Sequence, residues 1–131
     1  MLLNLKLNYD CVRDLLLYLE ENLTYENDVV INNISIKNYT EAELVYTAEK
    51  LYEANYLNCM KPQYIDEEIP SIIVLSLTYS GHQFLDTVRD NAVWDKTKKL
   101  SSSIASTSLK ILENIATNVI TNIISKQIGL S

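Results

Sequence analysis

Residues 40–60 read TEAELVYTAEKLYEANYLNCM, a pattern that predicts a helix with both of its ends and the start of a strand. Thr40 and Glu43 have the spacing of a capping box, in which each side chain accepts a hydrogen bond from the other residue's backbone N–H. Asn55 can take the left-handed conformation that ends many helices. Apolar side chains at helical spacing predict the stripe that faces the core: Leu44, Ala48 and Leu51, flanked by Val45 and Tyr52.

The segments on either side of this helix alternate between strand and helix patterns. Residues 56–65 and 72–77 predict two strands, and the polar link 66–71, DEEIPS, is typical of a hairpin loop. Upstream, residues 8–23 predict a first helix and the β-branched residues 29–34 a short strand.

Helical patterns continue to the end of the chain. A third helix begins near Thr78, with Thr78 or Ser80 as its cap. Ser101–Ser103 indicate a break, and the final helix is predicted over residues 104–128, with Gly129 as its stop. The residues of the third helix that are predicted to face inward are Phe84, Leu85, Val88 and Ala92.

The order helix, strand, helix, two-stranded hairpin, helix is the order of a winged helix. We therefore predict an α+β fold, with a winged-helix-like domain over residues 6–92. Residues 93–131 are predicted to form a C-terminal helical extension with a long amphipathic helix.

Three segments of this sequence resemble the domain-of-unknown-function 2513 family: residues 39–46, 51–57 and 77–89. Residues 90–98 and the tail that ends in Ile-Gly-Leu at 128–130 are also similar to that family, so the resemblance covers roughly residues 6–130. It implies a small winged-helix-like protein of bacteria and prophages. Because the family has no established activity, the resemblance gives no mechanism. The departures are Asn55, where glycine is usual, and the additional residues Met1–Leu5.

Charge is divided unevenly along the 131 residues. Up to Asp95 there are 6 basic and 16 acidic residues, a net of −10, and from Lys96 onward 5 basic and 1 acidic, a net of +4, giving −6 overall. This balance disfavours a general nucleic-acid binder, because affinity for phosphate comes from clustered Lys and Arg. With 47% hydrophobic residues the chain can bury a core. We expect a cytoplasmic protein with no transmembrane segment, because no long uncharged apolar run occurs.

The surfaces that a winged helix turns toward DNA are acidic in this chain. The outward side of the helix after Thr40 and the tip of the predicted wing are expected to bind a protein partner with a basic surface through Glu43, Tyr46, Glu49, Lys50, Glu53, Asp66, Glu67 and Glu68. Binding of DNA by the same fold stays open as an alternative, because a dimer could present Lys96, Lys98 and Lys99 from two chains.

Catalytic chemistry has little support in the sequence. His82 is the one histidine, and its neighbour Ser80 does not form a serine-hydrolase motif with it. Two glycines cannot build a phosphate-binding loop, and no spacing typical of a metal site surrounds Cys11 or Cys59, which are expected to be buried thiols rather than a disulfide. We expect no enzyme activity, no cofactor and no metal.

The final helix has an apolar arc of roughly 220°, wider than the stripe of a little over 100° that one core requires. Self-association into a dimer or larger bundle is the favoured interpretation. Packing on its own domain with a modest exposed patch, or binding to a membrane surface, are the alternatives. The predicted oligomerisation residues are Leu109, Leu112, Ile115, Ala116, Val119, Ile120, Ile123 and Ile124.

These patterns together predict a non-enzymatic protein-interaction or regulatory accessory factor, phage- or prophage-linked, that acts as a homo-oligomer. A winged-helix transcriptional regulator is the first alternative. An effector that associates with membrane surfaces through its C-terminal helix is the second.

Overall fold

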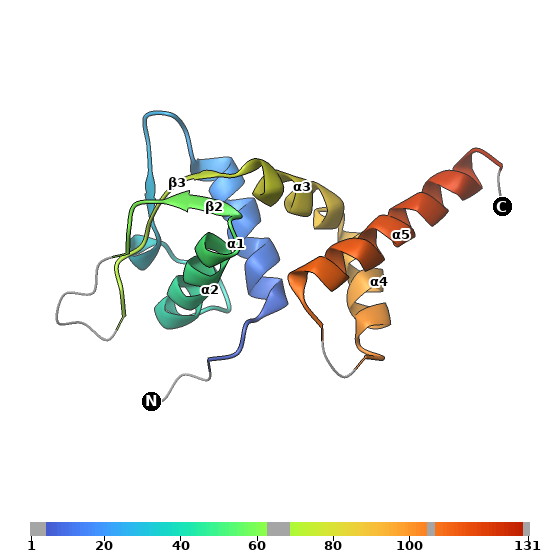
Figure 1. Ribbon diagram of the computed structural model, residues 1–131, viewed down its shortest axis with the longest axis horizontal. Helices are drawn as coiled ribbons and strands as arrows, with labels where there is room; N and C mark the ends of the chain where they lie inside the picture. The colour runs from blue at the N-terminus through green and yellow to red at the C-terminus, as the bar shows by residue number, and fades with distance from the viewer. Residues whose placement is uncertain (1–4, 63–68, 105–106, 130–131) are drawn as a thin grey trace. The chain divides into compact units, whose positions relative to one another are not determined.

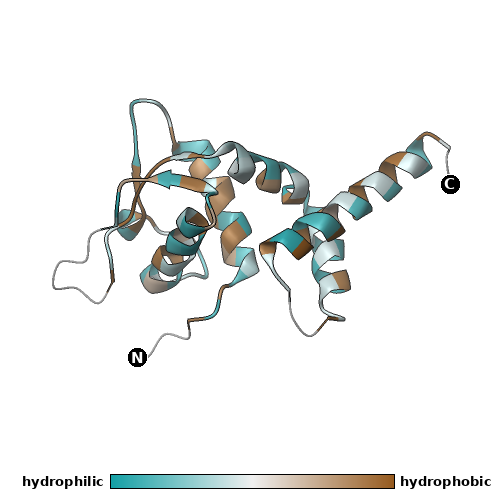
Figure 2. Ribbon diagram, viewed as in Figure 1, coloured by the Kyte–Doolittle hydropathy of each residue, from teal (hydrophilic) through white to brown (hydrophobic). Residues whose placement is uncertain are grey.

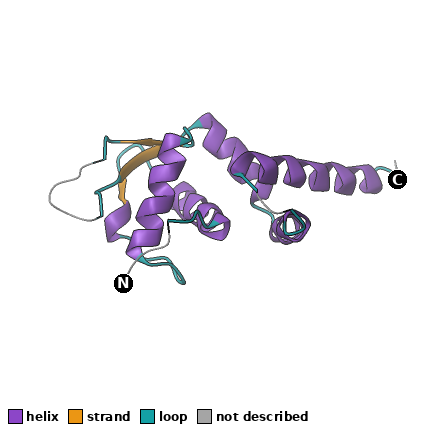
Figure 3. Cartoon of the chain, turned by 60° about the horizontal axis from the view of Figure 1, so that its bottom comes forward, coloured by secondary structure: helices purple, strands orange, loops and turns teal. Residues whose placement is uncertain are grey.

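The computed structural model describes residues 5–62, 69–104 and 107–129, and over these ranges the chain is an α+β protein (Figure 1). The described residues form five α-helices, one turn of 3-10 helix and three short strands (Figure 3). In chain order the elements are α1 (Tyr9–Asn22), β1 (Val29–Val30), η1 (Ile31–Asn33), α2 (Glu41–Glu53), β2 (Leu57–Cys59), β3 (Ile73–Leu77), α3 (Tyr79–Val88), α4 (Asn91–Ser101) and α5 (Leu109–Gln127). The chain divides into two compact units, Met1–His82 and Gln83–Ser131, and α3 crosses from one to the other.

The first unit contains a three-stranded antiparallel sheet with the strand order β1-β3-β2. β1 is shorter than the predicted strand over residues 29–34, because the chain turns into η1 after Val30. The side chain of Asn32 explains the turn. Its Oδ1 accepts a hydrogen bond from the Ile72 N–H at 3.0 Å, and its Nδ2 donates to the Pro70 carbonyl at 3.0 Å. An asparagine side chain thus takes the place of a backbone ladder, and the strand stops.

β2 pairs with β3 from Leu57, opposite Leu77, to Cys59, opposite Val74, with a bulge between Asn58 and Cys59. The predicted strand over residues 56–65 is therefore too long, since β2 ends at Cys59. Residues 63–68, which include half of the predicted hairpin loop, lie outside the described residues.

The core of the first unit lies between α1, α2 and the sheet, which contact one another. Much of the hydrophobic colour of this unit in Figure 2 lies on these elements. The predicted stripe of α2 is confirmed, because Leu44, Ala48 and Leu51 are all buried. Burial of a leucine side chain contributes about 1.5–3 kcal/mol, so these contacts dominate the stability of the unit. The largest buried side chains around them are Leu15, Leu16, Leu19, Ile31, Leu57 and Ile72.

Helix ends follow the local sequence closely. The capping box of α2 is present: the Thr40 hydroxyl accepts from the Glu43 N–H at 3.1 Å, and the Glu43 carboxylate accepts from the Thr40 N–H at 3.2 Å. Asn55 has a φ of 65°, the left-handed conformation predicted for it. For α3, the Thr78 hydroxyl accepts from the Gly81 N–H at 3.0 Å, so the cap is Thr78 rather than Ser80.

Two helix boundaries that were predicted in the second unit are wrong. The third predicted helix is two helices, because Asp90 begins α4 by accepting a hydrogen bond from the Val93 N–H at 2.9 Å. Ala92 is therefore exposed in the first turn of α4, whereas it was predicted to face inward. The final helix begins at Leu109 rather than Ile104, because the Ser108 side chain caps it. Gly129 has a φ of +79°, as expected for a helix stop.

α4 and α5 pack against each other within this unit. The buried side chains of α4 are Val93, Trp94 and Thr97. Those of α5 are Leu112, Ala116 and Val119, all in its first eleven residues.

Candidate interaction surfaces

The acidic side of α2 carries five of the predicted partner-binding residues, and the structure brings three of them together. Lys50 Nζ lies 2.9 Å from Glu53 Oε2, and it also lies 5.3 Å from the centroid of the Tyr46 ring. The hydrogen bond to Glu53 raises the pKa of Lys50. Glu53 therefore offsets the one positive charge of this surface, and the surface stays acidic.

Other predicted residues have different surroundings. The Glu43 carboxylate caps α2, as described above, and Glu49 is half-buried on the same helix. Asp66, Glu67 and Glu68, the predicted wing tip, lie outside the described residues.

The predicted oligomerisation residues of α5 fall into two groups. Leu112, Ala116 and Val119 are buried, so part of the wide apolar arc packs within the second unit. Leu109, Ile115 and Ile120 are half-buried. Ile123 is 42% exposed and Ile124 51% exposed, and Ile128, which follows the helix, is 65% exposed. The apolar arc of α5 therefore serves two different parts of the helix. In the first half of α5 it packs on α4, and in the second half its isoleucines are exposed among the described residues.

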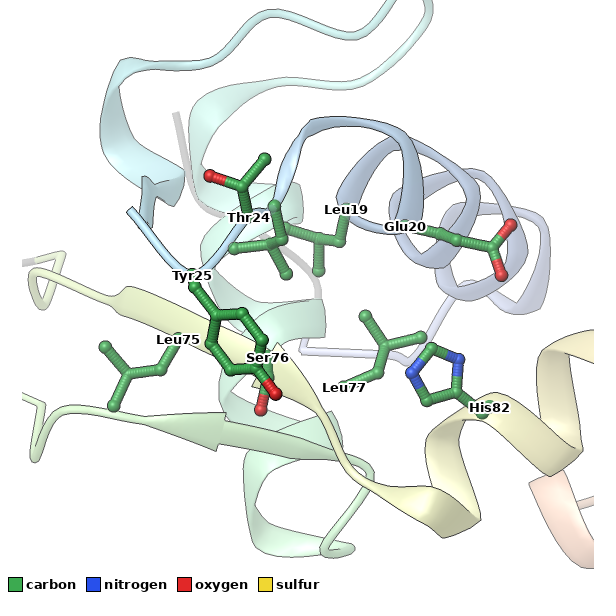
Figure 4. Close-up of a pocket in the computed structure, with 9 residues that line it drawn as sticks. Leu19, Glu20, Thr24, Tyr25, Leu75, Ser76, Leu77 and His82 are labelled. Carbon is green, nitrogen blue, oxygen red and sulfur yellow. The ribbon is translucent and has the colours of Figure 1, made fainter. Parts of the chain in front are cut away.

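A pocket of about 530 Å³ in the first unit was not predicted from the sequence (Figure 4). Its residues come from the end of α1, the loop after α1, β3 and the first turn of α3. His82, for which the sequence shows no catalytic motif, is exposed at one side of it. No local signal in the sequence identifies this pocket, because it depends on where β1 begins beside β3. The pocket is lined by Leu19, Glu20, Leu23, Thr24, Tyr25, Leu75, Ser76, Leu77 and His82.

Both cysteines are free thiols, but Cys59 is half-buried rather than buried as expected. Cys11 is fully buried, and its Sγ lies 3.3 Å from the Thr47 hydroxyl, which donates to the Glu43 carbonyl at 2.7 Å. Burial raises the pKa of Cys11 to about 11 and that of the half-buried Cys59 to about 11. Thiols with such pKa values are weak nucleophiles at neutral pH.

Residues 5–62, 69–104 and 107–129 contain no cluster of three His, Cys, Asp or Glu side chains suited to hold a metal ion. Within the same ranges, no helix combines the length and the hydropathy that crossing a bilayer requires.

A family model described as hypothetical proteins (DUF2513) matches residues 6–108, well over half of the chain. The chain belongs to the DUF2513 family. An uncharacterised protein of Haemophilus influenzae is 24% identical over 122 residues, which are 92% of this chain and all of that relative. No solved structure matches the chain.

The DUF2513 match ends at Ser108, the residue that caps α5. The matched region therefore contains the sheet, α1 to α4 and the cap, and α5 itself follows it. The resemblance of the tail, expected from the sequence, lies beyond the part that the DUF2513 model matches.

Proposed function

We propose that this protein is a non-enzymatic interaction or regulatory factor that assembles as a homo-oligomer through the second half of α5. The observation that supports the proposal is the distribution of buried residues along this helix. After Val119 no residue of α5 is buried, although Ile123 and Ile124 are apolar and Ile128 follows them. Exposed apolar surface of this kind is costly in water and is typical of an interface.

A second copy of the chain is the partner that fits this part of α5 best. Two equivalent helices related by a twofold axis would place the same isoleucines opposite each other. Each isoleucine removed from water would contribute up to about 1.5–3 kcal/mol before the cost of association. The polar side of the helix carries few charges that would oppose such packing. Its exposed residues include four that are neutral: Thr117, Asn118, Thr121 and Asn122.

A membrane surface is a weaker fit for the same helix. Amphipathic helices that bind anionic membranes usually carry many Lys or Arg side chains on their polar side. α5 has only Lys110 and Lys126, and Lys110 lies 3.6 Å from Glu113.

The first unit would then provide a recognition surface for another protein. The element order and the sheet order β1-β3-β2 support a winged-helix arrangement, in which α2 and the segment after β2 would form the usual contact surface. We propose a basic protein as the partner rather than DNA, because Glu53 neutralises Lys50 and the acidic residues of α2 would repel phosphate. The family resemblance favours a cytoplasmic, prophage-linked setting.

Oligomer mass is the direct test. The full chain should elute, in size-exclusion chromatography with light scattering, with at least twice the chain mass of 15.0 kDa. Ile123→Lys/Ile124→Lys should give the monomer mass with helical circular dichroism retained. The matched control Thr121→Lys/Asn122→Lys adds the same charge to the same helical turn and should keep the oligomer. A wild-type chain that is monomeric at all concentrations would contradict the proposal.

DNA binding is tested separately. An electrophoretic shift with DNA of the source genome at about 100 mM salt, removed by higher salt, would favour the regulator instead. We expect no shift.

A further inference from the structure

β3 is longer than the strand beside it, and this leaves part of one edge open. β1 pairs with β3 only at Val29–Val74 and Val30–Ile73. On that side, residues 75–77 of β3 have no strand beside them among the described residues, whereas on the other side β2 reaches Leu77. We call residues 75–77 on the β1 side the open edge.

The chain reaches β1 through a tight turn that begins at Thr24. The Thr24 hydroxyl accepts hydrogen bonds from the Glu26 N–H at 3.2 Å and the Asn27 N–H at 3.0 Å, and the backbones of Thr24 and Asn27 also bond to each other. This turn directs the segment before Val29 away from β3 instead of extending β1 along it. Tyr25, at the tip of the turn, is fully exposed.

The pocket of about 530 Å³ lies at the open edge (Figure 4). Leu19 and Leu77 supply a buried apolar floor, and Leu75 is 40% exposed beside them. Polar groups surround this floor: the Glu20 carboxylate of α1, the Ser76 side chain and the His82 imidazole. A strand edge beside an apolar pocket is the combination used by proteins that bind a peptide by adding it to a sheet.

We propose that the open edge binds an extended peptide segment of a partner protein, which continues the line of β1 and adds a short strand beside residues 75–77 of β3. One apolar side chain of the peptide enters the pocket over Leu19 and Leu77. A Lys or Arg of the peptide lies next to Glu20. Three residues of strand span about 10 Å, so the site binds a short peptide motif rather than a long strand.

The charge of the first unit determines which peptide fits. Residues 1–82 contain 5 basic and 13 acidic residues, a net of −8. Glu21, Glu26 and Asp28 are exposed on the helix end and loop that adjoin the pocket. A basic peptide would be attracted and an acidic one repelled, which sets both the association rate and the choice of partner. This inference names a second surface and does not depend on assembly through α5.

Peptide selection tests the site. A random heptapeptide library displayed on phage is selected against the full chain, and the peptides obtained are synthesised and titrated into ¹⁵N-labelled protein. We expect peptides with a Lys or Arg next to an apolar residue, and amide shifts concentrated at residues 75–77, Thr24, Tyr25 and His82. Replacing the central residue of the peptide with proline should abolish binding, because proline cannot donate to a strand ladder.

Variants distinguish peptide binding at the open edge from nonspecific binding elsewhere on the surface. Leu75→Arg and Glu20→Lys should each weaken binding of the selected peptide at least about tenfold, equivalent to about 1.4 kcal/mol. Glu21→Lys makes the same charge change on α1 at a residue that does not line the pocket and should have a smaller effect. The monomeric Ile123→Lys/Ile124→Lys chain should bind as wild type does.

Three outcomes overturn the proposal. They are failure to select any peptide, equal binding by Leu75→Arg, and shifts located at α2 or α5 instead of the open edge. None of them bears on the oligomer mass, so the two proposals fail independently.

Discussion

The carbonyl oxygen of Tyr56 occupies the space that a β-carbon on Gly81 would need. Gly81 is buried in the first turn of α3, where it also bonds to the Thr78 hydroxyl. Thr78 in turn donates its N–H to the Tyr56 carbonyl at 3.0 Å. The start of α3 is thus attached directly to the backbone just before β2, and a side chain at residue 81 would separate them.

Gly81→Ala should therefore reduce the free energy of unfolding by about 1–3 kcal/mol, the usual cost of overpacking. Urea unfolding followed by circular dichroism measures it. Ser80→Ala is the matched control, because Ser80 is exposed and does not cap α3; it should change stability by less than about 0.5 kcal/mol. Equal stability of Gly81→Ala and wild type would show that α3 does not need this close approach.

The phenol of Tyr39 donates a hydrogen bond to the Asp14 carboxylate at 2.7 Å and joins the segment before α2 to α1. Burial, followed by this hydrogen bond, raises the pKa of Tyr39. Tyr39→Phe should cost about 1 kcal/mol at pH 7, because the pair is only partly buried. A raised pKa in the folded state means that the phenol's contribution is present below its unfolded pKa and is lost as pH rises above it.

The difference in stability between wild type and Tyr39→Phe should accordingly shrink above about pH 10, the usual pKa of tyrosine. Urea unfolding of both chains at neutral and alkaline pH measures this difference, and the other tyrosines cancel because both chains contain them. A difference that stays constant with pH would mean that the hydrogen bond does not affect the titration of Tyr39.

The two thiols should react slowly in the folded protein. Their pKa values of about 11, against an ordinary 9.0, leave about 100-fold less thiolate at pH 8. With Cys11→Ala, the remaining Cys59 should react with a disulfide reagent about 100-fold more slowly than in urea, and Cys11 should be slower still because it is fully buried. Both pKa values are raised in the folded chain, so the unfolded chain loses its thiol protons first. The free energy of unfolding should therefore decline as pH rises from 9 toward 11. Equal rates in the folded and unfolded chains would contradict the prediction.

Local signals were enough to predict much of the first unit. The capping box at Thr40 and the left-handed Asn55 depend on residues that are adjacent in the sequence, and both were confirmed. The stripe of α2 follows from helical spacing alone. The family and the α+β class also followed from the sequence.

Boundaries that depend on a single cap or on distant contacts could not be predicted in the same way. Apolar spacing continues from Phe84 to Ala92, so the pattern hides the two-residue break at which Asp90 starts a new helix. β1 stops because the Asn32 side chain bonds to residues nearly forty positions away, at Pro70 and Ile72. The open edge lies at the other end of β1, where the turn at Thr24 brings the chain to Val29, and the sequence pattern does not show where pairing with β3 begins, so the candidate peptide site was missed. The acidic residues of α2 were predicted, but the pairing of Lys50 with Glu53 was not.

The strands on the two sides of the sheet are two and three residues long. Sheets grow into aggregates when a long, flat edge of one molecule pairs with the same edge of another. Here β1 and β2 are each too short to serve as such a template, and the open edge of β3 is limited to residues 75–77. The brevity of these strands thus protects the protein against uncontrolled edge-to-edge pairing, and the assembly that we propose uses a helix instead.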